Sequence, residues 1–417
     1  MKVLWFVNIA LPEYVAVRGG RAVTSGGWME AMITSIKEYT PEIKLFVAFI
    51  GDSVDRISVN GVTYFSLGKS CGVDFERQVA LCVEFVKPDV IHIHGTEVIA
   101  QVLPNFVFSA APVVLSIQGI MAECGKCFMG GLSSDILEPH IGFLRRILNK
   151  NRLCDVATQW QNRLAAREVE ICRKVKYFIG RTNFDKKWIE SINPTASYYH
   201  LNEIMRTIFY KGPRSISKIK KYTIFSNSIF SYPLKGGHLL LDALLEIKVR
   251  NPSVQLRVAA GEVCNPQEWL RRVKRNEYHR YIYSKIKETG LQNNIVLLPS
   301  LTASEVRTEL ERAEVFCLPS TMENSSNSLV EAQLAGVPTV VSNTGGCASV
   351  FSNSAAGYLV DSKNVRQLAR AICNIFEDSR HWQTIAQSSV KHLQCIHSRE
   401  KISLALVDIY RVVMKAV

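Results

Sequence analysis

The 417-residue sequence has no internal repeat of fixed short period and no uninterrupted apolar run long enough to cross a membrane. The missing repeat excludes solenoids and propellers. The 25 residues between Glu97 and Glu123 carry no charge, but prolines and polar residues interrupt them. We therefore expect a short helix, a turn and a buried strand there, and no transmembrane segment. Acidic residues are scarce, with 37 Asp and Glu against 50 Lys and Arg, a net charge of +13.

The positive charge is concentrated in two segments. Residues 141–190 hold twelve Lys or Arg against five Asp or Glu, and residues 211–221 add five basic residues and no acid. This concentration favours a local anionic partner over a polyanion bound across the whole surface. The segments lack interleaved aromatic residues, and the chain shows no recognition motif for nucleic acid. A basic nucleic-acid-binding protein is therefore the alternative from a different functional class, and we expect no nucleic-acid partner.

Cysteine usage argues against a disulfide framework. The eleven cysteines are an odd number and lie in apolar runs such as residues 81–83. Free buried thiols are typical of a reducing compartment, so we expect a cytoplasmic protein. The apolar start, followed at once by Pro12 and charged residues, predicts a buried strand rather than a signal peptide. Cys124 and Cys127 have the spacing of a metal knuckle without a second pair, which favours a loop with two free thiols.

Short apolar runs alternate with helical patterns along the chain, as in parallel β/α units. We expect an α/β protein with two Rossmann-like, doubly wound domains that face a central cleft, the default ligand site. The first domain covers residues 1–210 and binds the acceptor side, and the second covers 211–398, after a basic, loop-like linker. A last helix over 399–417 can pack on either domain, including back on the first. The expected strands are 3–7, 43–48, 62–64, 90–94, 113–117 and 177–180, then 223–226, 255–259, 295–298, 315–318, 339–342 and 357–360.

The most informative stretch is residues 318–346, LPSTMENSSNSLVEAQLAGVPTVVSNTGG. We expect a strand to end where this stretch begins. A loop follows, and then a helix that begins near Ser326, Asn327 and Ser328. The backbone N–H groups at such a helix start can bind a phosphate. Glu323 in the loop and Glu331 in the helix are expected to point into a solvent-filled crevice, where paired carboxylates can bind vicinal hydroxyls. Each glutamate taken alone is more often a solvated surface acid.

The spacing Pro-Ser-x-x-Glu-x7-Glu-Ala-x3-Gly-x-Pro-x-Val in this stretch resembles the family 4 retaining glycosyltransferases of the GT-B fold, glycosyl transferases group 1. Further similar parts are residues 90–95, 233–236, 258–261 and 345–346. The resemblance implies that Glu331 holds the ribose of a nucleotide and that Glu323 holds hydroxyls of the donor sugar. It also implies that Lys235 contacts the diphosphate, so that Glu323 and Lys235 form the catalytic pair.

The activity implied by the resemblance is transfer of a hexose from a nucleotide-diphosphate sugar. The acceptor is a glycan or a polyprenyl-diphosphate-linked glycan, in cell-surface polysaccharide biosynthesis. The chemistry is positioning and stabilisation of the leaving group, with no side-chain nucleophile. The sequence contains no Asp-x-Asp motif, the usual metal bridge of the other main glycosyltransferase fold, so we expect no metal and no other cofactor. Within enzymes, a GT-B-fold nucleotide-sugar epimerase is the alternative, although a clear acid/base cluster is missing.

The chain departs from the family at one phosphate contact. An Arg usually stands about six residues before the lysine, and Ile229 occupies that place. Arg181 is either a compensating cation or a surface arginine. Lys235 itself precedes two glycines and a helical pattern, which can put its ammonium at the floor of the cleft, although a lysine in this position is more often solvated when taken alone.

Three further features lie in the first half of the chain. Gly26 and Gly27 precede a helical pattern and match the glycine loop of the family, where backbone can approach a phosphate of the donor; residues 19–20 are a competing pair. His94 ends a buried strand and either faces the cleft or is structural. Gln118 ends the next strand, where many relatives carry a histidine. We treat His94 and Gln118 as candidates for the acceptor side.

Residues 140–152 predict a basic amphipathic helix. Arg145 and Arg146 stand between apolar residues at helical spacing. Such a helix can lie on anionic lipid headgroups at the inner face of the cytoplasmic membrane or attract a phosphorylated acceptor. A packed helix with a solvated basic face is equally compatible with this pattern.

Overall fold

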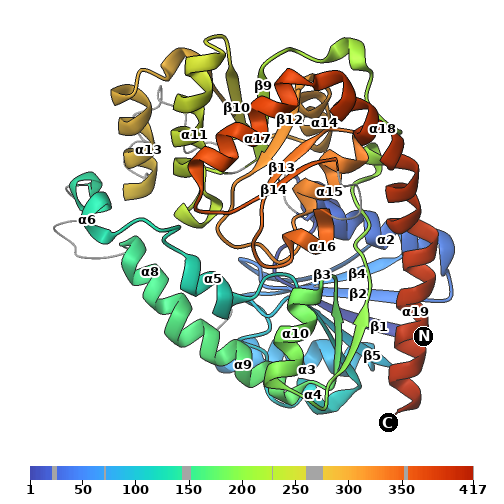
Figure 1. The fold of residues 1–417 in the computed structure, drawn as a ribbon. Coiled ribbons are helices and arrows are strands. Elements are labelled where there is room, and N and C mark those ends of the chain that lie inside the picture. The colour runs from blue at the N-terminus through green and yellow to red at the C-terminus, as the bar shows by residue number, and fades with distance from the viewer. Residues whose placement is uncertain are drawn as a thin grey trace. The chain divides into compact units, whose positions relative to one another are not determined.

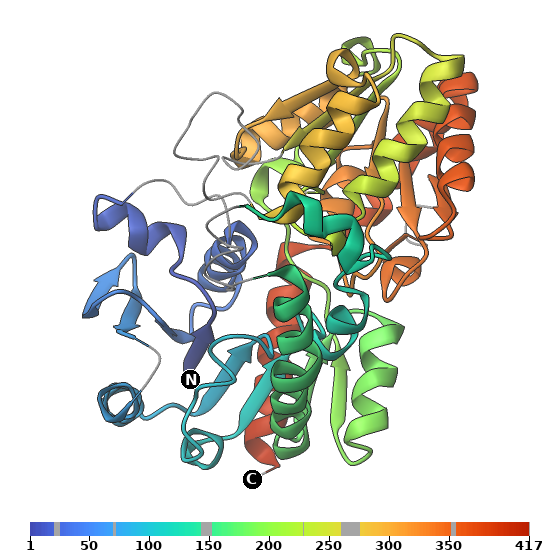
Figure 2. The ribbon, with the colours of Figure 1, turned by 90° about the vertical axis from the view of Figure 1, so that its left-hand side faces the viewer.

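The computed structural model describes residues 1–20, 26–69, 72–142, 152–227, 229–259, 276–351 and 356–416. The chain divides into two compact units, each built around one sheet (Figures 1 and 2). The first unit comprises Met1–Ala122, Arg163–Arg206 and Ile396–Val417, and the second comprises Glu123–Asn162 and Thr207–Cys395.

The sheet of the first unit has eight strands in the order β3-β4-β2-β1-β5-β6-β7-β8. All neighbours are parallel except β3 and β4, which form an antiparallel hairpin. The six strands expected in this half are present, within a few residues at their ends. The bounds are β1 (Lys2–Val7), β2 (Lys44–Phe49), β3 (Val54–Val59), β4 (Val62–Leu67), β5 (Val90–His94), β6 (Val113–Ser116), β7 (Tyr177–Gly180) and β8 (Ser197–His200).

Two strands of this sheet, β3 and β8, were not predicted. Neither contains a buried residue, because each lies at an edge of the sheet and so lacks the continuous apolar pattern of the central strands. The hairpin did have a local signal. Asn60 and Gly61 connect β3 to β4 with φ of +48° and +82°, the positive values that favour an Asn-Gly turn.

The last helix, α19 (Arg399–Lys415), belongs to the first unit, one of the two placements considered. Its Tyr410 hydroxyl accepts a hydrogen bond from Trp5 Nε1 at 3.0 Å and lies 2.6 Å from His92 Nδ1. His92 Nε2 lies 2.6 Å from Ser116 Oγ. The side chains of Tyr410, Trp5 and His92 are almost fully buried. These polar contacts therefore join α19 to β1, β5 and β6 within the core. The other helices of this unit are α1 (Pro12–Val17), α2 (Gly27–Tyr39), α3 (Val73–Val86), α4 (Val107–Ala110), α9 (Ala165–Lys174) and α10 (Asn183–Ile192).

The sheet of the second unit is entirely parallel, with the order β11-β10-β9-β12-β13-β14. This is the doubly wound arrangement, and the order reverses between β9 and β12. All six strands expected here are confirmed. Their bounds are β9 (Thr223–Asn227), β10 (Gln255–Ala259), β11 (Ile295–Leu298), β12 (Val315–Leu318), β13 (Thr339–Ser342) and β14 (Gly357–Val360). The helices are α11 (Gly237–Arg250), α13 (Glu277–Glu288), α14 (Ala303–Arg312), α15 (Asn327–Leu334), α16 (Cys347–Phe351), α17 (Val365–Glu377) and α18 (Ser379–Ile396).

The segment from Glu123 to Asn162 corrects the expected division of the chain. It lies between β6 and β7 of the first sheet in sequence, yet it belongs to the second unit. The physical reason is that its apolar residues Phe128, Leu137 and Leu153 are buried in the core of the second unit. Its elements are α6 (Ser134–Leu137), η1 (Glu138–His140) and α8 (Leu153–Gln159), after α5 (Met121–Cys127), which starts in the first unit. The chain passes again from the first unit to the second after Arg206, close to residue 210, the expected end of the first domain.

Three further predictions can be compared with the structure. No helix within the described ranges is long and apolar enough to cross a membrane. The nine cysteines in those ranges are free thiols, and Cys124 and Cys127 lie in helix α5 rather than in the expected loop. Arg145 and Arg146 lie outside the described residues, with the rest of 143–151, so the basic amphipathic helix stays a prediction.

Candidate active site

The candidate donor-side residues of the second unit follow two adjacent strands. β9 leads through η5 (Pro233–Lys235) into α11, and β12 leads through a loop into α15. These two strands flank the point where the strand order reverses. Ligands of doubly wound sheets bind beyond the carboxyl ends of the strands at this point. The topology therefore brings residues far apart in sequence to one ligand-binding edge.

Lys235 and Glu323 form an ion pair at this edge. Lys235 Nζ lies 2.6 Å from Glu323 Oε1, and the Ser320 hydroxyl donates to the same oxygen at 2.9 Å. The side chains are 33% and 14% exposed, so solvent still reaches both. Burial alone would lower the pKa of Lys235, but the Glu323 carboxylate outweighs burial and raises this pKa above its ordinary value. Lys235 is therefore charged at neutral pH. The two residues predicted to be catalytic are in direct contact.

The ion pair leaves binding capacity on both partners. A lysine ammonium has three N–H donors, and only the bond to Glu323 is recorded for Lys235 in the described part of the chain. Both hydrogen bonds recorded for the Glu323 carboxylate reach Oε1. Glu323 Oε2 can therefore accept a hydrogen bond from a ligand hydroxyl while Lys235 donates to a phosphate oxygen.

Backbone contacts hold the Glu323 loop in place. Thr321 N donates to Leu234 O at 2.8 Å, which ties the loop to the residue before Lys235. Gly346 N donates to Glu323 O at 3.0 Å. At Gly345, φ is +50° and a Cβ would lie 2.1 Å from Glu323 O, so only glycine fits there. The Gly345-Gly346 pair of the motif thus acts by permitting this close approach.

The start of α15 lies at the same edge. Ser326 is its N-cap residue and makes no side-chain cap hydrogen bond, and Asn327 is its first residue. Ser328 Oγ accepts a hydrogen bond from Asn227 Nδ2 at 3.3 Å, which links the helix start to the end of β9. Glu331 lies inside α15 and is 4% exposed. Little of Glu331 is therefore open to solvent, so the solvent-filled crevice expected around this residue is not seen, while its contact with a ribose stays a prediction.

The missing arginine also has a structural explanation. Ile229 is fully buried in the apolar core of the second unit, where a guanidinium could not stay solvated. Arg181 belongs to the first unit, is 7% exposed, and pairs with Glu203 through Nη1 and Oε2 at 2.5 Å. The interpretation of Arg181 as a surface residue is therefore wrong, and a contact of Arg181 with phosphate stays a prediction.

His94 and Gln118, the two candidates for the acceptor side, line one narrow cavity of the first unit together with Trp28. His94 is 5% exposed, and neither ring nitrogen has a hydrogen-bond partner in the described ranges. Burial lowers the pKa of His94 to about 3, so the ring is neutral at physiological pH. The Gln118 amide is oriented by Glu203, to whose Oε1 its Nε2 donates at 2.8 Å.

Gly26 and Gly27 begin α2, directly before Trp28. Gly26 is the N-cap residue with φ of +78°, a value that favours glycine. A Cβ on Gly27 would lie 2.8 Å from Arg206 Cδ, so the side chain of Arg206 approaches this glycine closely. These two glycines stand at the carboxyl edge of the first sheet, whereas Lys235 and Glu323 belong to the second unit.

Two carboxylates of the first unit that bind loop backbone were missed at the sequence level. Glu97 is half-buried; its Oε1 accepts from Gly119 N at 2.9 Å, and desolvation raises the pKa of Glu97. Glu168 is fully buried, accepts from Met121 N at 3.0 Å and Ala122 N at 2.8 Å, and burial raises its pKa to about 7. Both hold loops at the strand ends. Glutamates that make such long-range contacts have no local signal in the sequence. No group of three or more His, Cys, Asp or Glu in the described ranges could hold a metal ion.

Comparison with known families covers the second unit. Residues 209–391 match the model of the family described as glycosyl transferases group 1. This span contains strands β9 to β14 and the residues Lys235, Glu323 and Glu331. The resemblance seen in the motif is confirmed for this part of the chain.

Curated relatives match part of the chain. The putative glycosyltransferase YtcC of Bacillus subtilis is 24% identical over 202 residues, which cover 47% of this chain and 48% of YtcC. A D-inositol 3-phosphate glycosyltransferase of Corynebacterium urealyticum is 27% identical over 178 residues, which cover 43% of this chain and 40% of that protein. The chain thus matches about half of the length of these relatives or less.

Solved structures are similar over nearly the whole chain. Sucrose-phosphate synthase of Thermosynechococcus elongatus superposes with a TM-score of 0.69 at 12% identity and covers 100% of both chains. Anabaena HepE, crystallised with UDP and glucose, superposes with a TM-score of 0.66 at 17% identity and covers 98% of both chains. The expected α/β fold with two Rossmann-like units, the GT-B fold, is confirmed.

Proposed function

We propose that this protein is a retaining glycosyltransferase that moves a hexose from a nucleotide-diphosphate sugar to a glycan or lipid-linked glycan. The observation that carries the proposal is the Lys235–Glu323 ion pair at the point where the strand order of the second unit reverses. One partner supplies a cation for phosphate and the other a carboxylate for hydroxyls. The family match over 209–391 and the UDP and glucose bound by HepE support this interpretation.

In the proposed donor site, Lys235 donates to the diphosphate and Glu323 Oε2 accepts from a hydroxyl of the sugar. The N–H groups at Ser326, Asn327 and Ser328 add the positive end of the α15 dipole. Glu331 holds the ribose. Gly26 and Gly27 are proposed as the contribution of the first unit to donor binding.

The proposed chemistry places the acceptor hydroxyl near the anomeric carbon and stabilises the charge that develops on the departing diphosphate. Lys235 and the start of α15 supply positive charge there, so the proposal needs no metal ion. We expect full turnover in the presence of a chelator of divalent cations. His94 and Gln118 are proposed to act on the acceptor side, as are Arg145 and Arg146.

The proposal further assigns the reaction to cell-surface polysaccharide biosynthesis. The enzyme would then work in the cytoplasm, at the inner face of the membrane when the acceptor is lipid-linked. The high basic content of residues 141–190 supports an anionic surface as a partner.

The proposal is tested by incubating the protein with a panel of UDP-, GDP- and ADP-sugars and measuring nucleotide release. Glu323→Gln should spare nucleotide affinity and lower turnover by about 100-fold or more, whereas Glu331→Gln should weaken the binding of free nucleotide about tenfold. Glutamine is chosen because Glu331 is buried and the amide keeps the side-chain volume. Glu377→Gln, on an exposed residue of α17, is the matched control and should change neither quantity.

Three results would contradict the proposal in different parts. Unchanged nucleotide affinity in Glu331→Gln would refute the assignment of the ribose. Normal turnover in Glu323→Gln would refute the sugar contact. Absence of nucleotide release with every donor, together with thermal stabilisation by oligonucleotides that is lost steeply with salt, would favour the nucleic-acid-binding alternative.

A further inference from the structure

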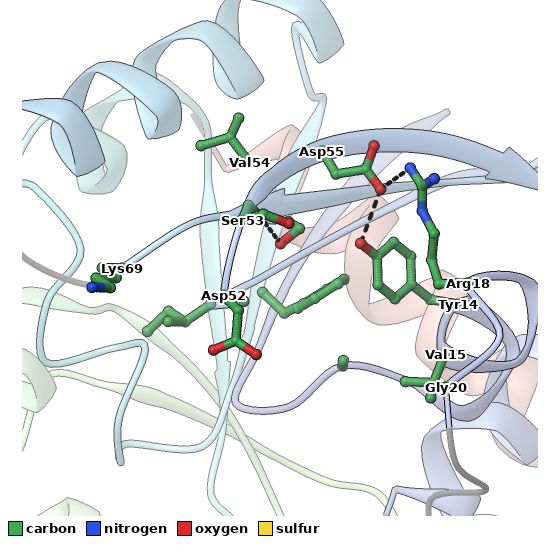
Figure 3. Close-up of a pocket in the computed structure, with 14 residues that line it drawn as sticks. Tyr14, Val15, Arg18, Gly20, Asp52, Ser53, Val54, Asp55 and Lys69 are labelled. Carbon is green, nitrogen blue, oxygen red and sulfur yellow. Dashed lines mark hydrogen bonds and ion pairs between the residues drawn. The ribbon is translucent and has the colours of Figure 1, made fainter.

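A hollow of about 900 Å³ opens in the first unit, and none of the residues assigned above lines it (Figure 3). It lies beside the carboxyl ends of β1 and β2, the edge at which parallel sheets bind ligands. Its volume falls within the range of ligand pockets. Its polar lining is formed chiefly by Tyr14, Arg18, Asp52, Asp55 and Lys69.

One side of the hollow is held by contacts between side chains. The Tyr14 hydroxyl donates to Asp55 Oδ2 at 3.0 Å, and Arg18 forms an ion pair with the same oxygen. The Arg18 guanidinium lowers the pKa of Asp55 below its ordinary value, so Asp55 is ionised at neutral pH. The Tyr14 ring also packs edge-on against Phe49 with 4.8 Å between ring centroids. An aromatic ring is thus fixed in the wall.

Two charged side chains of the hollow are free for a ligand. Asp52 and Lys69 are exposed, and neither side chain has a recorded hydrogen bond or ion pair within the described ranges. Figure 3 shows Lys69 on the side opposite the group of Arg18, Asp55 and Tyr14. A ligand between these sides would meet an aromatic ring, two carboxylates and two cations.

This composition discriminates between chemical classes of ligand. Arg18 and Lys69 balance Asp52 and Asp55, so the charged side chains of the hollow sum to zero. A diphosphate would need a net positive lining, and an acyl or isoprenoid chain would need a continuous apolar one. A neutral polyhydroxylated ligand fits, because carboxylates accept from paired hydroxyls, cations donate to ring and hydroxyl oxygens, and the face of Tyr14 packs against the C–H groups of a sugar.

We propose that this hollow binds neutral sugar residues of the acceptor. The inference rests on the proposed transferase function and narrows its substrate. The acceptor is recognised in the first unit through its glycan and not through a diphosphate. The Asp52 carboxylate makes no hydrogen bond or ion pair with another described side chain, so it can accept from hydroxyls of the sugar. The Tyr14 ring packs against the sugar.

The test measures binding of sugars to the full chain in the absence of nucleotide. Saturation-transfer NMR would be recorded with neutral trisaccharides of glucose, mannose and galactose, and separately with inorganic diphosphate and farnesyl diphosphate. We expect at least one trisaccharide to bind, and Asp52→Asn to weaken its affinity about tenfold. Asp74→Asn, on another exposed carboxylate, which belongs to α3 and lies outside the lining, is the matched control and should leave affinity unchanged.

Tyr14 supplies a second, independent variant. Tyr14→Phe keeps the ring and should retain most of the affinity, whereas Tyr14→Ala should abolish binding of the trisaccharide. Unfolding temperatures recorded for each variant separate loss of binding from loss of fold, and Asp52→Asn carries the test if Tyr14→Ala is unstable.

Three results would overturn the inference: no trisaccharide binds at millimolar concentration, Asp52→Asn binds as tightly as the unaltered chain, or inorganic diphosphate displaces the sugar. The outcome is separable from that of the proposed function. Nucleotide release without any binding of neutral sugars refutes only this hollow as the acceptor site. Binding that depends on Asp52, without turnover of any nucleotide sugar, refutes only the transferase.

Discussion

Replacing His238 by leucine should destabilise the second unit by a calculable amount. His238 directly follows the Lys235-Gly236-Gly237 turn and is 3% exposed. Its Nε2 lies 3.0 Å from Gly130 O, and its Nδ1 lies 3.1 Å from the Tyr278 hydroxyl. A carbonyl oxygen can only accept, so Nε2 carries the proton and Nδ1 accepts from Tyr278. The ring thereby joins the turn after Lys235 to the segment that begins at Glu123 and to α13.

His238→Leu removes both hydrogen bonds and leaves the Gly130 carbonyl without this donor. Each such loss in a buried site costs about 1–3 kcal/mol, which gives about 2–6 kcal/mol for the two hydrogen bonds. In a unit of this size 1 kcal/mol shifts the unfolding temperature by about 2–4 °C, so we expect a fall of about 5–20 °C at pH 7. Loosening of the turn should also raise KM for the nucleotide sugar, because Lys235 lies only three residues before His238.

The same substitution should change the acid dependence of stability. Burial lowers the pKa of His238 to about 4, from 6.5 in the unfolded chain. The unfolded state therefore binds the proton more readily. The stability that comes from the neutral ring is complete above about pH 6.5 and is lost as pH falls toward 4. The gap corresponds to about 3 kcal/mol, so the difference in stability between the variant and the unaltered chain should shrink markedly between pH 7 and pH 4.

Thermal unfolding at pH 7, 5.5 and 4 tests both expectations. His392→Leu, an exposed histidine of α18, is the matched control and should unfold within about 1 °C of the unaltered chain. An unfolding temperature for His238→Leu equal to that of the control at pH 7 would refute the energetic role of the two hydrogen bonds. A destabilisation that stays constant down to pH 4 would refute the buried neutral ring.

Three other substitutions probe both units. Tyr410→Phe removes the hydroxyl that contacts the buried Trp5 indole and His92 imidazole. We expect it to lower the free energy of unfolding, measured in urea, by about 2–5 kcal/mol. A change below about 1 kcal/mol would count against this network. Arg181→Met leaves the Glu203 carboxylate buried without its ion-pair partner and should cost about 3–5 kcal/mol, most of it recovered when Glu203→Gln is added. Gly345→Ala should shift the Glu323 loop and lower turnover while thermal stability changes less, and normal turnover would show that the loop adapts.

Most of the fold could be predicted because the central strands carry a local signal. Residues 315–318 of β12 are all buried, and such a continuous apolar run is what a strand covered on both faces requires. The edge strand β3 has alternating exposed and half-buried residues, and recognising it needed the Asn60-Gly61 turn. β8 had neither signal, because its residues are only partly covered at the edge of the sheet.

The candidate site was predictable where residue type and spacing suffice. The string from Pro319 to Val340 indicated the helix start at Ser326 and both glutamates. Spacing could not show that Lys235 and Glu323 pair with each other across 88 positions, since that contact depends on the adjacency of β9 and β12. Nor could it show that Glu331 is buried.

The sequence by itself determined the two alternating β/α halves, the position of the donor-side motif and the excess of positive charge, because each is carried by composition or by short-range periodicity. The tertiary structure alone decided which core the segment from Glu123 to Asn162 joins and that Arg181 is enclosed with Glu203. The tertiary structure also decided that Ile229 is buried in the core, at the position where the family usually has an arginine. These outcomes depend on which apolar surfaces and charges meet after folding, and a chain of alternating units does not specify such long-range partners residue by residue.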